Sequence, residues 1–253
     1  MFEPTAGSDA SITATASLSQ PAAADLVARV LGTTLAGRVL TVTCAPALSR
    51  ASLREARKHD LERRRDTTPG FRRPGTRVDT EGRYSLTPED LALELGRLAR
   101  GRAVVDLGCG VGGNAIGFAR SGSRVLAAIE RNTTRVRLAR HNAAVYGVDD
   151  RIEFISGDAR AVVLERDLRA PLLFVDPPWG RDWATELPGL RDMPLLQDAI
   201  ELRGRFDELW IKLPPSFDPR ELPDAGLTAI FGASRGDRQY VKFLLARLPG
   251  RAR

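Results

Sequence analysis

The feature that most constrains the fold is a regular alternation of short apolar runs and helical stretches, which begins near Leu86 and continues to about residue 245. Thr87 and Pro88 open the first helical stretch as N-cap and first helical residue. Strand-length apolar runs between amphipathic segments indicate parallel strands joined by crossover helices. The predicted strands are 103–107, 124–129, 152–156, 172–175 and 208–213; the predicted helices are 87–100, one from 113 onward, 133–146, 160–166 and 190–202.

Two further strand-like runs, 227–231 and 240–245, close the pattern. The turn between them, Ser234–Asp237, is too short for a crossover helix, so we expect the two strands to pair antiparallel. The sequence therefore predicts an α/β fold with a doubly wound, mostly parallel seven-stranded sheet that ends in an antiparallel hairpin.

The formal net charge is +6, and the excess lies in one segment, Arg50–Arg77, which we call the basic block. Ten Arg or Lys residues stand there against four acids. Such a block indicates contact with a polyanion such as RNA. The alternative is a solvated helix face, which charge runs often form.

The sequence predicts three parts: a flexible Ala-, Ser- and Thr-rich tail (1–20), a basic extension (21–83) and a larger domain (84–253). Within the extension we expect a helix-like stretch over 22–40, a short strand over 38–44, a polar helix over 50–65 and an irregular linker over 67–83. The two cysteines show no metal or disulfide spacing, and no run approaches the ~20 apolar residues of a membrane span. We expect a cytoplasmic monomer without a metal or membrane partner.

A glycine-rich loop, Asp106–Gly113, follows the first strand of the larger domain. Such loops let a ligand approach the backbone closely. The spacing Gly108-x-Gly110-x-Gly112-Gly113 differs from the G-x-G-x-x-G of a pyrophosphate site. Because an acid ends the strand just before the loop, we expect S-adenosylmethionine as the cofactor, with Asp106 on its ammonium group.

Acids also end the next two strands. Glu130 is placed to accept hydrogen bonds from ribose hydroxyls, and Asp158 from an adenine amino group. Any one of these acids alone is as well explained as a turn or helix cap. Three acids at the carboxyl ends of three consecutive strands favour a ligand site.

The fourth strand ends in Asp176-Pro177-Pro178-Trp179. Two prolines stop the hydrogen-bond ladder and form a rigid elbow. The Asp176 carboxylate and the Pro177 carbonyl then suit the two hydrogens of an exocyclic amine on a base, which Trp179 would stack. The alternative is a proline-ended strand with a packed tryptophan.

These motifs together resemble the RNA cap guanine-N2 methyltransferase (trimethylguanosine synthase) family from about residue 79 to residue 214. The resemblance implies a Rossmann-like class I methyltransferase core behind a small N-terminal extension. It implies that Thr87 and Pro88 close over the donor and that Trp179 stacks guanine. The matching segments are Glu81–Glu89, Val105–Asn114 with Gly108, Gly110, Gly113 and Asn114 in the donor loop, Asn142–Gly147, Ile152–Asp158 and Pro177–Gly180.

Two positions depart from the family pattern: Arg83 stands where an aromatic residue is expected, and Arg181 stands where a second glycine is expected. The reaction therefore carries over better than the cap substrate. Trp183 is expected to help line the base pocket, and Lys212 to meet a phosphate.

The resulting hypothesis is a methyltransferase acting on an exocyclic amino group, with guanine N2 in RNA preferred. The alternatives are adenine-N6 or cytosine-N4 methylation of RNA or DNA, and a non-catalytic RNA-binding module that keeps the fold.

Overall fold

The computed structural model describes residues 3–6, 12–30, 34–35, 38–65, 70–179, 189–233 and 238–250. The chain divides into two compact units, Met1–Asp66 and Thr67–Arg253. This boundary precedes the one predicted at 83/84, because residues from Phe71 onward pack on the larger unit and Phe71 itself is buried.

The smaller unit contains α2 with the bounds predicted from the sequence. Ser49 caps this helix, since its hydroxyl accepts a hydrogen bond from Ser52 N at 3.0 Å. The predicted strand over 38–44 is limited to a two-residue ladder, and two short paired strands lie within the predicted flexible tail. The elements are β1 (Glu3–Ala6), β2 (Ile12–Thr15), α1 (Gln20–Val30), β3 (Thr34–Leu35), β4 (Arg38–Val39) and α2 (Arg50–Arg65).

The larger unit is built on a seven-stranded sheet in the order β10-β11-β9-β8-β5-β6-β7. The five strands from β7 to β9 pair in parallel, and β11 pairs antiparallel with both β9 and β10. The predicted sheet with its terminal hairpin is therefore confirmed, while the turn Ser234–Asp237 lies outside the described residues. The strands are β5 (Val104–Leu107), β6 (Val125–Glu130), β7 (Ile152–Ser156), β8 (Ala170–Val175), β9 (Phe206–Leu213), β10 (Gly226–Phe231) and β11 (Val241–Pro249).

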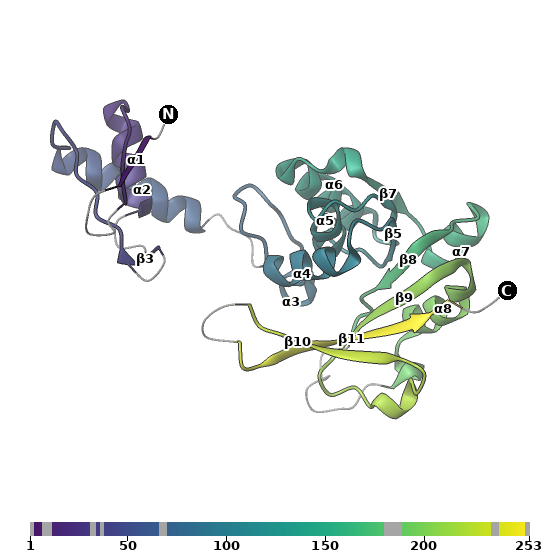
Figure 1. Cartoon of the computed structure of the whole chain (residues 1–253). Coiled ribbons are helices and arrows are strands. Elements are labelled where there is room, and N and C mark those ends of the chain that lie inside the picture. The colour runs from purple at the N-terminus through teal and green to yellow at the C-terminus, as the bar shows by residue number, and fades with distance from the viewer. Residues whose placement is uncertain are drawn as a thin grey trace. The chain divides into compact units, whose positions relative to one another are not determined.

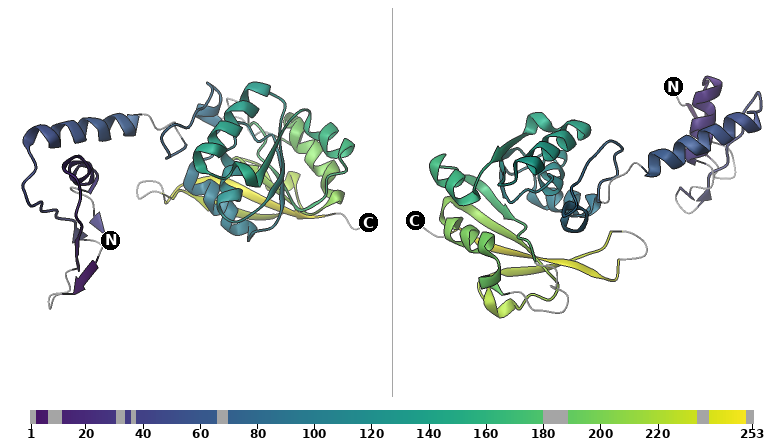
Figure 2. Two further views of the ribbon diagram at one scale, coloured as in Figure 1. Left: turned by 90° about the horizontal axis from the view of Figure 1, so that it is seen from above. Right: turned by 180° about the vertical axis from the view of Figure 1, so that it is seen from behind.

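Helices cover both faces of this sheet, giving a three-layer arrangement (Figures 1 and 2). Alternate strand residues face opposite layers: Phe174 meets Phe118 edge-on at 5.1 Å, whereas Leu173 packs in the cluster that contains Leu196. No helix of the described ranges is both long and apolar enough to cross a bilayer. The helices are α3 (Gly82–Ser85), α4 (Glu89–Ala99), α5 (Gly113–Arg120), α6 (Thr133–Tyr146), α7 (Ala159–Glu165) and α8 (Pro194–Leu202).

Residues 70–82, predicted as part of an irregular linker, form a segment fixed across α6, which we call the strap. The side chain of Asn142 is fully buried, accepts from Arg77 N at 2.8 Å and donates to Arg77 O at 2.9 Å. The Tyr146 hydroxyl accepts from the main-chain amides of Arg72 and Arg73 and donates to Glu89. The segment lacks regular structure because side chains, rather than a ladder, satisfy its backbone groups.

A second hydrogen bond from Asn142 ties the strap to the glycine loop: its amide donates to Val111 O at 3.0 Å. The strand order of the sheet reverses between β5, which precedes that loop, and β8. In sheets of this kind, ligands bind outside the carboxyl ends of the strands at such a switch point. The fold therefore directs attention to the residues that follow β5 and β8.

Candidate active site

Three acidic residues meet at the carboxyl ends of β5, β6 and β8: Asp106, Glu130 and Asp176. Asp106 is completely buried, and neither of its carboxylate oxygens has a hydrogen-bond partner among the described residues. Burial, reinforced by the charges of Asp176 and Glu130, raises the pKa of Asp106 well above its usual range. An unpaired buried carboxylate is costly, so this end of the sheet is suited to binding a cation.

Glu130 holds the glycine loop in place. Its Oε2 atom accepts from Gly110 N at 3.1 Å, and its Oε1 atom accepts from Asn132 N at 2.8 Å. The predicted contact of Glu130 with ribose hydroxyls stays a prediction. The carboxylate can still make it, because each oxygen can accept more than one hydrogen bond.

The glycines of the loop leave open space on one side and are closely packed on the other. Gly108 and Gly110 have φ values of +73° and +55°, a conformation that favours glycine. A methyl group on Gly108 would come within 2.6 Å of Leu195, whereas one on Gly110 would meet no atom within 4 Å. The open side of the loop at Gly110 is therefore where a ligand can approach the backbone.

Asp176 is fixed by three hydrogen-bond donors that all contact Oδ2. They are Lys212 Nζ at 2.7 Å, Asn114 Nδ2 at 3.0 Å and Thr87 Oγ1 at 3.3 Å. None of these three donors contacts Oδ1, and the side chain keeps 14% of its surface exposed. One carboxylate oxygen is thus held by the protein while the side chain remains reachable.

The role of Thr87 as a helix N-cap is corrected by the structure. Helix α4 begins at Glu89, its N-cap is Pro88, and no side chain caps it. The Thr87 side chain is buried and its hydroxyl donates to Asp176 instead. Thr87 therefore links the start of α4 to the end of β8.

Trp179 lies half-buried beyond the two prolines, of which Pro177 is buried and Pro178 exposed. The indole N–H donates to the main-chain carbonyl of Lys212 at 3.3 Å, and the Lys212 ammonium lies 4.8 Å from the ring centroid. Lys212 is itself buried, with its ammonium paired to Asp176. Trp183 falls outside the described residues.

Asp158 stands at the same edge of the sheet, but its surroundings differ. It is exposed and caps α7, since its Oδ1 atom accepts from Ala161 N at 3.0 Å. The capping role considered from the sequence is therefore present, and the contact with adenine stays a prediction.

The pairing of Lys212 with Asp176 was missed from the sequence, although the strand register could have indicated it. Strands β8 and β9 run parallel with Val175 opposite Ile211. The next residue on each strand is therefore Asp176 and Lys212, and neighbours in register project to the same face. Asn142 and Tyr146 were noted as part of a motif, but their role in fixing the strap needed the coordinates.

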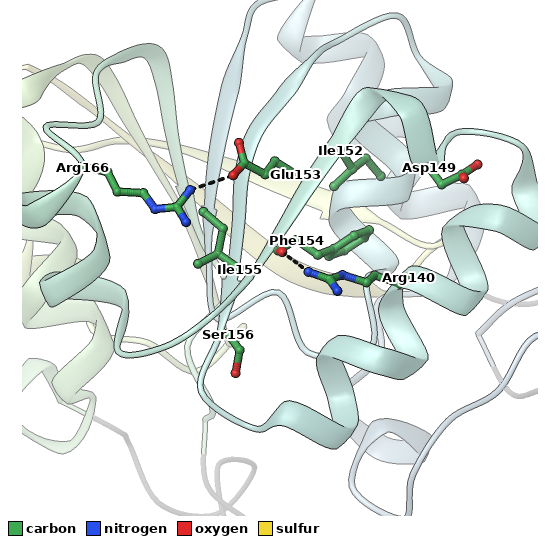
Figure 3. A pocket seen from close by; sticks show the side chains of 8 residues that line it. All are labelled: Arg140, Asp149, Ile152, Glu153, Phe154, Ile155, Ser156 and Arg166. Carbon is green, nitrogen blue, oxygen red and sulfur yellow. Dashed lines mark hydrogen bonds and ion pairs between the residues drawn. The ribbon is translucent and has the colours of Figure 1, made fainter.

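A hollow of about 590 Å³ lies elsewhere, along the edge strand β7 (Figure 3). Its two arginines already have partners: Arg140 donates to Phe154 O at 2.7 Å, and Arg166 pairs with Glu153 at 2.6 Å. The hollow follows the outer edge of the sheet, away from the switch point between β5 and β8. We therefore place the candidate site at the carboxyl ends of the strands.

The residues present fit an S-adenosylmethionine molecule. Asp106 offers two buried oxygens without a donor, and Oδ1 of Asn114 is a third. The ammonium group of a methionine moiety has three N–H donors, and the space beside Gly110 lies open. These acceptors would otherwise remain unsatisfied, which native interiors rarely tolerate.

Comparison with known proteins agrees with this geometry. A family model described as RNA cap guanine-N2 methyltransferase matches residues 101–183. A Pyrobaculum aerophilum protein described as "probable cobalt-precorrin-6B C(15)-methyltransferase (decarboxylating)" is 35% identical over 118 residues, which cover 45% of this chain and 54% of that protein. The chain thus matches about half the length of that curated relative.

Solved structures share the fold. A candidate methyltransferase from Porphyromonas gingivalis has a TM-score of 0.59 at 22% identity, covering 92% of this chain and 59% of that one. A protein of unassigned function from Thermus thermophilus has a TM-score of 0.50 at 17% identity, covering 72% and 98%. The predicted resemblance and the Rossmann-like methyltransferase fold are both confirmed.

Proposed function

We propose that this S-adenosylmethionine-dependent methyltransferase, which resembles the RNA cap guanine-N2 methyltransferases over residues 101–183, methylates an exocyclic amino group of a nucleobase. Guanine N2 in RNA is the preferred substrate. The observation that carries the proposal is the fixed carboxylate of Asp176, which is joined to the donor loop through Asn114 and to the aromatic elbow through Lys212.

The donor side of the site consists of the glycine loop and the acids around it. Asp106 and the side-chain oxygen of Asn114 would hold the ammonium group, and Glu130 and Asp158 would accept hydrogen bonds from the ribose and the adenine. Thr87 and Pro88 would close over the ligand. When bound, S-adenosylmethionine supplies an electrophilic methyl group on a positively charged sulfur.

The acceptor side consists of Asp176, Pro177 and Trp179. The Asp176 carboxylate and the Pro177 carbonyl would accept the two amine hydrogens. These bonds favour the pyramidal nitrogen that develops as the lone pair attacks, so they stabilise the transition state more than the ground state. Trp179 would stack the base, a contact typically worth ~1–3 kcal/mol. A carboxylate beside the reacting nitrogen can also take up the proton that the amine releases.

The choice of guanine N2 in RNA rests on the description of the matching family model and on the basic block. In the first half of α2, the side chains of Arg50, Arg54, Arg57 and Lys58 are all exposed. Exposed cations of this density can follow a phosphate backbone. The arginines of the strap, at positions 72, 73 and 77, are exposed as well and belong to the larger unit.

Adenine-N6 and cytosine-N4 methylation are the nearest rivals, because a carboxylate followed by a proline carbonyl suits any primary exocyclic amine. The curated relative is described as acting on a corrinoid carbon, which is a different acceptor. A non-catalytic RNA-binding module is the rival of another class.

The test is methyl transfer from labelled S-adenosylmethionine to total RNA from a strain that lacks this gene, followed by nucleoside analysis by mass spectrometry. We expect labelled N2-methylguanosine. Asp176→Ala should abolish it, and Asp224→Ala, which removes an exposed acid elsewhere, should not.

Labelled N6-methyladenosine or N4-methylcytidine would replace guanine with a rival base. Absence of S-adenosylmethionine binding in a calorimetric titration would favour the non-catalytic module.

A further inference from the structure

Lys212 joins the two groups that face the proposed substrate. Its ammonium lies 2.7 Å from Asp176 Oδ2 and 4.8 Å from the ring centroid of Trp179. Its main-chain carbonyl accepts the indole N–H at 3.3 Å. The side chain is only 7% exposed, so water screens its charge poorly.

The ammonium is therefore engaged inside the site and is not offered to a phosphate, as the sequence had predicted. The ring of Phe243 also lies close to it, with its centroid 5.4 Å from Nζ. A cation held by a carboxylate and two aromatic rings is restricted in position.

We propose that Lys212 is a positioning residue for methyl transfer: it holds Asp176 by one oxygen, so that the other oxygen accepts the substrate amine, and it sets the angle of the Trp179 ring. Asn114 and Thr87 complete the grip on Oδ2 from the donor side. The acceptor pair for the amine is then Oδ1 of Asp176 together with the Pro177 carbonyl. This role rests on the proposed function.

The charges around Asp176 make the lysine necessary for a second reason. Asp106 on β5 lies close enough for its charge to interact with that of Asp176, and Glu130 on β6 interacts in turn with Asp106. Lys212 on β9 is the cation paired with Asp176, while the donors on α5 and before α4, at positions 114 and 87, are neutral. Without Lys212, like charges would favour the protonated form of Asp176, which cannot accept two amine hydrogens.

The experiment compares wild type, Lys212→Met and Lys212→Arg in single-turnover and steady-state methyl transfer across pH, together with calorimetric titration of S-adenosylmethionine. For Lys212→Met we expect kcat to fall about 10²-fold, the magnitude typical of a misplaced reacting group. The acid limb of the kcat–pH profile should move to higher pH by about one unit or more, because Asp176 loses its cation.

Donor binding separates this role from a structural one. The donor carries net positive charge, so removal of a nearby cation should leave its Kd unchanged within about twofold or lower it. Lys212→Arg retains the charge and should recover at least tenfold of the lost kcat and restore the acid limb.

A Lys212→Met protein with wild-type kcat and an unshifted acid limb would overturn the role, as would a loss of donor binding that parallels the loss of kcat. A wild-type protein that methylates no RNA overturns the proposed function itself, and that outcome is recognised before any variant is made.

Discussion

Replacing Asp106 with asparagine should make the protein more stable and less able to bind its donor. The carboxyl group is fully buried without a hydrogen-bond donor, and its pKa in the folded protein is raised above the ordinary value of 3.8. A raised carboxyl pKa means that the unfolded chain gives up this proton at lower pH than the folded one. Folding stability therefore decreases as pH rises from about 4 toward the folded-state pKa.

Asparagine has the same shape and no charge, and its amide can donate to the carboxylates of Asp176 and Glu130. We expect the free energy of unfolding of the donor-free protein to increase by about 1–2 kcal/mol at neutral pH, as for other relieved functional sites. The decline in stability with pH should become shallower, since the titrating group is gone.

Donor affinity should change in the opposite direction. The ammonium of S-adenosylmethionine would lose charge-assisted hydrogen bonds worth about 1.5–3 kcal/mol. At about 1.4 kcal/mol for each factor of ten, the Kd should rise roughly 10- to 150-fold.

Urea unfolding of the donor-free protein at several pH values and calorimetric titration of S-adenosylmethionine measure the two effects. Asp158→Asn is the matched control for stability, because Asp158 is exposed and asparagine caps a helix equally well. A less stable Asp106→Asn protein that binds the donor as tightly as wild type would refute the reasoning.

Three other predictions concern the loop, the strap and the basic block. Gly110→Ala and Gly147→Ala place a methyl group in open space at positive φ, so each should lose about 1 kcal/mol of stability, but only Gly110→Ala should weaken donor binding in a calorimetric titration. Tyr146→Phe should destabilise by about 1–2 kcal/mol in urea unfolding. Burial opposes ionisation of Glu89, but hydrogen bonds led by that of Tyr146 lower its pKa, so this stabilisation is present above the ordinary value of 4.5 and is lost as pH falls below it. Truncation to residues 67–253 should flatten the dependence of RNA affinity on salt, by about 0.7–0.9 in log–log slope per lost phosphate contact, and an unchanged slope would remove that role from α2.

The fold was predictable because its signals are local. Each parallel strand is a short apolar run, each crossover helix has its own start signal, and the antiparallel hairpin follows from a turn too short for a helix. The acids at strand ends were predictable for the same reason: parallel strands deliver their carboxyl ends to one edge, so Asp106, Glu130 and Asp176 had to meet.

The remaining features depend on contacts between distant residues. Thr87 reads locally as a helix cap, but burial against the end of β8 turns its hydroxyl to Asp176, 89 positions away. The strap has no periodicity, because its backbone groups are satisfied by single side chains such as Asn142, 65 positions after Arg77. Local propensity carries no information about partners at such separations.

The amide of Asn142 contacts Arg77 on one side and Val111 on the other, which joins the strap and the donor loop in one hydrogen-bonded unit. Segments linked in this way open together in native-state hydrogen exchange. Donor binding, which engages only the loop, should therefore slow the exchange of strap amides that the donor never touches.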